Sequence, residues 1–197
     1  MQSDVSRLLR ETADSLRVIS ESDYSEAVER ALTLLEEAFR AGRTLLAFGN
    51  GGSSADAQHL CAELVGRFLL ERRALPAVAL TTNQALLTAW SNDYQFDDIF
   101  ARQIEGLGRP GDVAWGISTS GNSANVVAAA ERASAMDLAV LALTGRTGGK
   151  LAPLADIAIR IPSDVTAHIQ EAHLATEQLL ALLVERAIHP DPVPDIG

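Results

Sequence analysis

The residues best suited to chemistry are His59 and Glu63, which lie four positions apart in the segment ADAQHLCAELVGRFLL. The spacing of apolar residues in this segment predicts a helix, on which the two side chains lie about 40° apart around the axis and share one face. An imidazole and a carboxylate so placed can transfer protons or bind a metal ion. The same spacing also occurs in an ordinary ion pair on a solvent-exposed face. The glycine-rich loop before the helix favours a role in proton transfer or metal binding over an ordinary ion pair.

A glycine-rich loop comes directly before this helix. The apolar run TLLAF at 44–48 has the pattern of a strand buried on both faces of a parallel sheet, and it leads into GNGGSS at 49–54. The glycines permit tight backbone turns, and Ser53 or Ser54 is a natural N-cap for the helix. Free N–H groups at a helix start attract anions. A strand, a turn and a helix over 44–70 therefore predict a phosphate site.

A second loop of the same kind follows the apolar strand predicted at 113–117. It reads STSGNS at 118–123 and leads into the helical pattern ANVVAAAERASAM. In a doubly wound sheet of order 2-1-3-4-5, the first and third strands are neighbours, so the two loops would converge on one crevice. One loop could then hold a phosphate and the other a sugar. The simpler alternative is a capped turn with no ligand.

The other segments complete one α/β domain with a five-stranded parallel sheet. Further strands are predicted at 77–80, 139–144 and 157–161, and helices at 3–19, 23–41, 85–90, 96–107 and 165–188. The expected organisation is a helical hairpin at 1–42, which packs on the domain or on a neighbouring subunit, and a domain at 43–190. Proline and acidic residues predict a disordered tail at 191–197.

Composition limits the classes of protein to which the chain can belong. With 197 residues, of which 47% are hydrophobic, it can bury one substantial core. No apolar run approaches the roughly 20 residues of a membrane span, and no secretory pattern is visible, so a soluble cytoplasmic protein is expected. Cys61 is the single cysteine, which argues against an internal disulfide or a cysteine metal cluster. The net charge of −10 argues against direct nucleic-acid binding.

Several motifs resemble those of the phosphoheptose isomerases of the sugar isomerase (SIS) family. The matching stretches span nearly the whole chain: GNGGSSADAQH with AELVGRF, NDYQFDDIFARQ, GDVAWGISTSGNSANV, LTGRTGGKLA and IQEAHL. The resemblance implies a three-layer α/β/α sandwich of flavodoxin-like strand order, a homotetramer with active sites between subunits, and no nucleotide cofactor. Family members convert sedoheptulose 7-phosphate to D-glycero-D-manno-heptose 7-phosphate in bacterial heptose synthesis, and several bind zinc.

The resemblance also implies roles for individual residues. The catalytic pair falls on Glu63, as the base of an aldose–ketose isomerisation through an enediol, and on His59. The implied substrate-binding residues are Asn50, Gly51, Gly52, Ser53, Glu63, Asn92, Asp93, Ser118, Thr119, Ser120, Ser123 and Gln170. The implied zinc ligands are His59, Glu63, Gln170 and, as a weak ligand, Gln178.

Gln178 stands where the family has a second catalytic histidine. A neutral amide cannot exchange a proton near pH 7 and binds zinc weakly. His173 faces another side of the helix than Gln178, so it does not simply replace that histidine. Two alternatives to an enzyme therefore stay open. One is a non-catalytic adaptor resembling the DnaA initiator-associating protein, which would have a DnaA-like partner, and the other is a phosphosugar-binding module.

Overall fold

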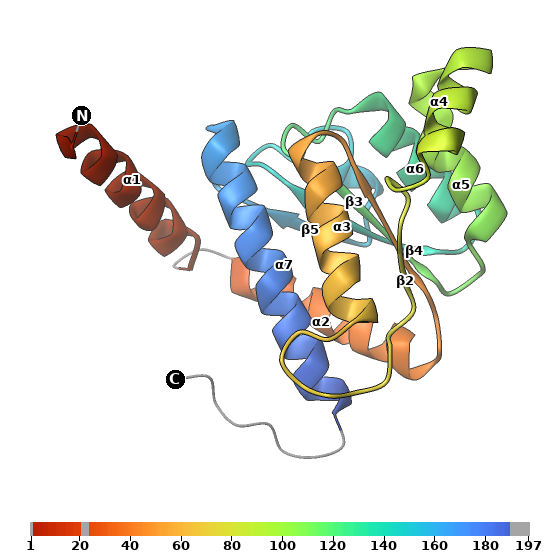
Figure 1. Ribbon diagram of the computed structural model, residues 1–197, viewed down its shortest axis with the longest axis horizontal. Coiled ribbons are helices and arrows are strands. Elements are labelled where there is room, and N and C mark those ends of the chain that lie inside the picture. The colour runs from red at the N-terminus through yellow and green to blue at the C-terminus, as the bar shows by residue number, and fades with distance from the viewer. Residues whose placement is uncertain (1, 21–23, 190–197) are drawn as a thin grey trace.

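The computed structural model describes residues 2–20 and 24–189, which form a three-layer α/β/α sandwich (Figure 1). The strands are β1 (Leu45–Gly49), β2 (Ala77–Ala79), β3 (Val113–Ser118), β4 (Ala139–Thr144) and β5 (Ile157–Arg160). The helices are α1 (Gln2–Ser20), α2 (Tyr24–Arg40), α3 (Gly52–Val65), α4 (Gln84–Asp93), α5 (Ile99–Leu107), α6 (Ala124–Ala135) and α7 (Thr166–Ile188), with short 3₁₀ turns η1 (Phe96–Asp98) and η2 (Ala152–Leu154). The tail predicted at 191–197 lies outside the described residues.

The sheet is parallel throughout and has the predicted order, β2-β1-β3-β4-β5. Leu45 of β1 pairs with Val113 of β3, and the register continues to Gly49 beside Ile117. Every residue of β1 and β3 is buried, which explains their unbroken apolar runs. Because β1 and β3 are neighbours, the loops that follow them leave the same edge of the sheet side by side.

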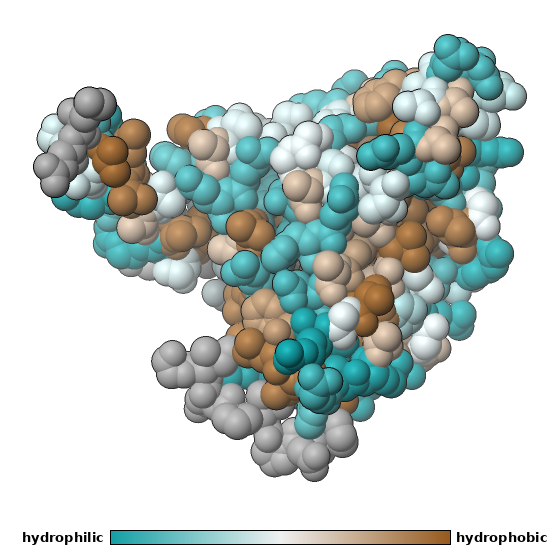
Figure 2. All heavy atoms as spheres, viewed as in Figure 1, coloured by the Kyte–Doolittle hydropathy of each residue, from teal (hydrophilic) through white to brown (hydrophobic). Residues whose placement is uncertain are grey.

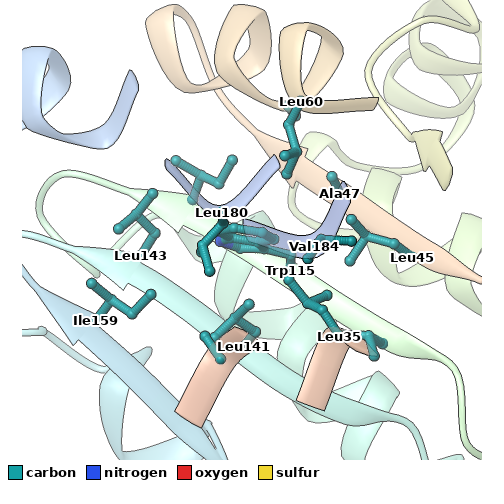
Figure 3. Packing of buried hydrophobic residues seen from close by; sticks show 14 of the residues in the cluster. Leu35, Leu45, Ala47, Leu60, Trp115, Leu141, Leu143, Ile159, Leu180 and Val184 are labelled. Carbon is teal, nitrogen blue, oxygen red and sulfur yellow. The ribbon is translucent and has the colours of Figure 1, made fainter. Parts of the chain in front are cut away.

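Alternate side chains of the strands enter two cores, one on each face of the sheet. Trp115 is fully buried on the face covered by α2, α3 and α7, among Leu35, Leu60 and Leu180 (Figure 3). The neighbouring strand residues, such as Ala114, point to the opposite face, which α5 and α6 cover. Figure 1 shows α3 and α7 in front of the sheet, with α5 and α6 at the right of the picture. Among the described residues, no helix is long and apolar enough to cross a membrane.

The two N-terminal helices differ in how they pack. α2 contributes Leu35 and Phe39 to the core, whereas α1 stands away from the body of the molecule (Figure 1). Val5, Leu8 and Leu9 of α1 are more than half exposed, and hydrophobic atoms are visible on this helix in Figure 2. An exposed apolar stripe is typical of a helix that packs on another surface. The division of the chain at residue 43 stays a prediction.

The helix predicted to continue to Leu70 ends earlier, at Val65. The side chain of Glu185, which is fully buried on α7, accepts hydrogen bonds from the N–H groups of 68, 69 and 70 at 3.0, 2.7 and 3.0 Å. Arg72 donates to the carbonyl oxygens of 63 and 64, and its Nε lies 3.1 Å from a Glu185 oxygen. These bonds hold residues 66–72 as a loop, so tertiary contacts override the local helical pattern.

The predicted serine N-cap of this helix is also wrong. Gly51 is the N-cap, with φ of 57°, and the helix start makes no side-chain capping hydrogen bond. Ser53 is buried, directly against the position that a side chain on Gly49 would occupy. The remaining boundaries differ from the predicted ones by a few residues; α4, for example, continues to Asp93.

Glu185 is expected to contribute strongly to stability. Glu185→Gln keeps the size of the side chain but leaves Arg72 without its buried countercharge. We expect the free energy of unfolding to fall by about 3 kcal/mol, because one member of a buried ion pair is left alone. Urea unfolding measures the change, with Glu171→Gln at an exposed position of α7 as the control. Equal unfolding midpoints for wild type and Glu185→Gln would contradict the prediction.

Candidate functional site

Two hydrogen bonds join the loops that follow β1 and β3. The Asn50 side-chain amide donates to Asn125 Oδ1 at 2.7 Å, and the Asn125 amide donates to Asn50 Oδ1 at 2.9 Å. Asn125 lies at the start of α6 and is 2% exposed. The convergence of the two loops, predicted from strand order, is therefore confirmed. Asn125 itself was not predicted; the signal was a polar side chain in the first turn of an otherwise apolar helix.

The glycine loop also receives a side chain from α7. A Cβ placed on Gly52 would overlap Nε2 of Gln170, so a larger residue could not occupy this position without displacing the amide. Gly51 next to it has a positive φ, which favours glycine. The structure thus brings together Asn50, Gly51, Gly52 and Gln170 from the predicted substrate-binding set.

The serine loop forms its own network of hydroxyl and backbone contacts. The hydroxyl oxygens of Ser118 and Ser123 are 3.1 Å apart, and the Asn122 N–H donates to the Ser120 hydroxyl at 3.1 Å. Ser123 is the N-cap of α6, yet its side chain makes no capping bond. Thr119 and Ser120 face a cavity of about 250 Å³. We call this cavity the cradle; its other walls are Asn122, Arg146, Thr147, Ser163, Asp164, Thr166 and Ile169.

His59 and Glu63 lie on α3, beyond the glycine loop. Nε2 of His59 is 3.7 Å from Oε1 of Glu63, too far for a strong hydrogen bond. Their side chains are 38% and 24% exposed, so both remain accessible from solution. Nε2 of His59 is itself buried and has no hydrogen-bond partner among the described residues. The exposed parts of the two side chains can therefore engage a bound molecule.

Three predicted site residues are not brought to these loops by contacts among the described residues. Asn92 and Asp93 are exposed at the end of α4, where the Asn92 amide donates to the Asp93 carboxylate at 2.8 Å. Figure 1 shows α4 and α7 on opposite sides of the molecule. Gln178 lies on the exposed side of α7, whereas His173 of the same helix is fully buried. The roles implied for Asn92, Asp93 and Gln178 stay predictions.

A buried polar group between α3 and α7 was not predicted. His173 and Glu177 are fully buried, and neither carboxyl oxygen of Glu177 has a hydrogen-bond partner among the described residues. Burial, and secondarily the charge of Asp56, raises the pKa of Glu177 to about 9. Burial raises the pKa of Asp56 to about 6, against the opposing effect of His59. Burial lowers the pKa of His173 to about 4.

The residues present do not fit the zinc ion that the resemblance implies. Zinc is bound in proteins by thiolate, imidazole or carboxylate groups, and only His59 and Glu63 of the expected set carry one. Gln170 and Gln178 are neutral amides, which bind zinc weakly. Within 2–20 and 24–189, no group of three or more His, Cys, Asp or Glu side chains is placed to hold a metal ion.

Comparison with known proteins identifies the family. The SIS domain family matches residues 8–145. The chain belongs to the SIS domain family. A phosphoheptose isomerase from Rhodospirillum rubrum is 48% identical over 188 residues, covering 95% of this chain and 99% of that protein. One from Crocosphaera subtropica is 50% identical over 162 residues, covering 82% and 83% of the two chains.

Solved structures of SIS proteins agree with this assignment. Phosphoheptose isomerase GmhA from Neisseria gonorrhoeae matches with a TM-score of 0.88 and 41% identity, covering 93% of this chain and 98% of that chain. A phosphoheptose isomerase from Francisella tularensis matches with a TM-score of 0.89 and 34% identity, covering 94% and 98% of the two chains. This SIS protein is thus an isomerase, as the sequence predicted, and the comparisons do not favour the adaptor.

The buried carboxyl of Glu177 predicts a dependence of stability on pH. A carboxyl whose pKa is raised on folding makes stability fall as pH rises from its unfolded to its folded pKa, here from 4.5 to about 9. The lowered pKa of His173 acts oppositely, with stability lost as pH falls below 6.5. Between about pH 6.5 and 8.5, Glu177 should therefore lower the free energy of unfolding by up to about 1.4 kcal/mol per pH unit.

Glu177→Gln removes the titrating proton, so the decline over this interval should largely disappear. Urea unfolding at four pH values measures the slope in wild type and variant. Glu171→Gln, which changes an exposed carboxylate on the same helix, is the control and should retain the wild-type slope. An unchanged slope in Glu177→Gln would show that another group causes any dependence observed.

Proposed function

We propose that this SIS isomerase interconverts an aldose phosphate and a ketose phosphate, with sedoheptulose 7-phosphate and D-glycero-D-manno-heptose 7-phosphate as the pair. The observation that carries the proposal is the amide pair of Asn50 and Asn125, which fixes the glycine loop and α3 next to the serine loop. A sugar phosphate can then contact both loops while its reacting carbons approach α3. The names of the relatives support the heptose phosphate as substrate.

The serine loop and the cradle are proposed to bind the phosphate. Hydroxyl groups of Thr119 and Ser120 and the guanidinium of Arg146 line the cradle, and such donors are suited to phosphate oxygens. The start of α6 adds the positive end of a helix dipole close to Ser123. The glycine loop and Gln170 are proposed to bind the sugar hydroxyls.

Glu63 is proposed to move the carbon-bound proton. Its carboxylate removes a proton from C1 of the ketose, and the electron pair forms the C1–C2 double bond of an enediol. Return of the same proton to C2 leaves the aldehyde at C1. The 24% exposure of the Glu63 side chain keeps it accessible to the substrate.

His59 is proposed to transfer protons to and from the oxygen atoms on C1 and C2 of the sugar. As C1 loses its proton, the oxygen on C2 must gain one, and the hydroxyl on C1 loses one in the second half of the reaction. We propose that the His59 imidazole, whose Nε2 lies 3.7 Å from Glu63, carries this proton between the oxygens. Because Gln178 cannot exchange protons, the catalytic groups of this chain are confined to α3.

The protein is proposed to act in the cytoplasm as a homo-oligomer, with the tetramer of the resemblance as the expected form. The exposed apolar residues of α1, including Leu8 and Leu9, support packing on another subunit. The same packing is what would bring Asn92 and Asp93 to a site shared between subunits.

Loss of the Glu63 carboxylate is expected to abolish turnover. Glu63→Gln keeps the shape of the side chain but removes the base, so isomerisation of sedoheptulose 7-phosphate should fall by at least 10²-fold, the usual contribution of a general base. Aldose formation by the purified protein measures the rate. Glu131→Gln on α6 is exposed and lies outside the site, and it should retain wild-type turnover. The same background rate in wild type and Glu63→Gln would refute the enzymatic proposal.

A hydroxyl in the serine loop should matter only to phosphorylated ligands. Ser120→Ala removes a donor at the cradle, together with the acceptor of the Asn122 N–H, so binding of sedoheptulose 7-phosphate should weaken by roughly 1 to 3 kcal/mol. Titration calorimetry with this compound and with unphosphorylated sedoheptulose measures the difference. If the wild type bound both compounds equally well, the cradle would have no role in phosphate recognition.

A further inference from the structure

A second cavity opens beside the outer strand of the sheet. It has a volume of about 390 Å³ and lies among the start of α2, the loop after β4 and the end of β5. Three arginines line it, Arg30 from α2, Arg146 from the loop and Arg160 from β5, together with Tyr24 and Glu26. We call this cavity the arginine pocket. Neither His59, nor Glu63, nor any residue proposed to bind the sugar lines this pocket.

The charge of the pocket is opposite to that of the protein. The chain carries a net charge of −10, yet three guanidinium groups face one carboxylate here. Among the described residues, no carboxylate lies within 4.0 Å of a guanidinium nitrogen of Arg30 or Arg160. Arg146 is the exception, with Nε 2.9 Å from Asp164. Such an excess of positive charge attracts anions to the pocket.

Two of the arginines are held in place by the backbone. Arg30 donates to the Asp156 carbonyl at 3.1 Å, and Arg146 donates to the Pro162 carbonyl at 2.8 Å. Each bond uses one of the five guanidinium N–H groups and leaves others for a ligand. The pocket lies at the carboxyl ends of β4 and β5, the edge where open α/β sheets bind ligands. Arg30 and Arg146 are thus held by the fold at a site accessible to small molecules.

We propose that the arginine pocket binds a phosphate-bearing small anion at a site separate from the substrate cradle. Guanidinium groups pair with phosphate oxygens through two parallel hydrogen bonds. Glu26 and the Asp164 carboxylate that pairs with Arg146 offset part of the charge of the three arginines, and the positive charge that remains attracts a phosphate monoester, which carries roughly −1.5 to −2 at neutral pH. The volume is within the usual range for a small-molecule site, which favours such a ligand over a polymer. Arg146 borders both cavities, so an occupant of one should alter the other.

Inorganic pyrophosphate is the probe for this site. Calorimetric titration at constant ionic strength should show binding to wild type, weakened about tenfold or more in Arg160→Gln and in Arg30→Gln. Arg43→Gln is the matched control, because Arg43 is an exposed arginine just before β1, at the opposite edge of the sheet, and its loss changes the net charge equally. The control should bind as wild type does. The side-chain Nε–H signals of Arg30 and Arg160 in NMR spectra should shift during the titration.

Several results would overturn the proposal. Equal affinities of wild type, Arg160→Gln and Arg43→Gln would show that the pocket does not bind the anion. Loss of pyrophosphate binding in Ser120→Ala, with binding intact in Arg160→Gln, would place the anion in the cradle instead. Citrate binding as tight as that of pyrophosphate would contradict the phosphate class. If Arg160→Gln changed the molar mass measured by analytical ultracentrifugation but left the affinity for pyrophosphate unaltered, the arginines would contact a second copy of the chain.

Discussion

The pair of hydrogen bonds between Asn50 and Asn125 is the interaction on which the site depends. Each amide is donor and acceptor at once, so both bonds form only when the loops after β1 and β3 are in their final positions. Asn125 is almost completely buried, and an amide buried without its partners would be costly. Since α3 begins immediately after the first loop, this pair also fixes the starting point of the helix that carries His59 and Glu63.

Helix α7 supports the same site at three levels along its length. Near its start, Gln170 contacts the glycine loop; in its middle, His173 and Glu177 are buried beside α3; and near its end, Glu185 holds the loop that follows α3. The exposed Gln178 contributes to none of these contacts. One helix therefore supports α3 along its length, while the two residues proposed to transfer protons, His59 and Glu63, lie on α3 itself.

In a strongly acidic chain, anion binding depends on the charges and hydrogen-bond donors close to the cavity rather than on the net charge. Charges more than about 8 Å away are largely screened at physiological salt, so hydroxyls, helix starts and arginines near a cavity decide what it binds. Hydroxyl groups and Arg146 line the cradle, and guanidinium groups from three separate elements line the arginine pocket. The net charge of the chain gives no indication that either cavity is suited to an anion.

The sequence alone determined the parallel sheet, its strand order, both loops and the pair His59 and Glu63. These features depend on local patterns, namely apolar runs, glycine and serine between strand and helix, and helical spacing. Only the tertiary structure decided that α3 ends at Val65, that Glu177 is buried, and that arginines from α2, β5 and the loop after β4 share one cavity. Each of these depends on residues far apart in sequence, and local periodicity carries no information about which distant side chain will be the partner.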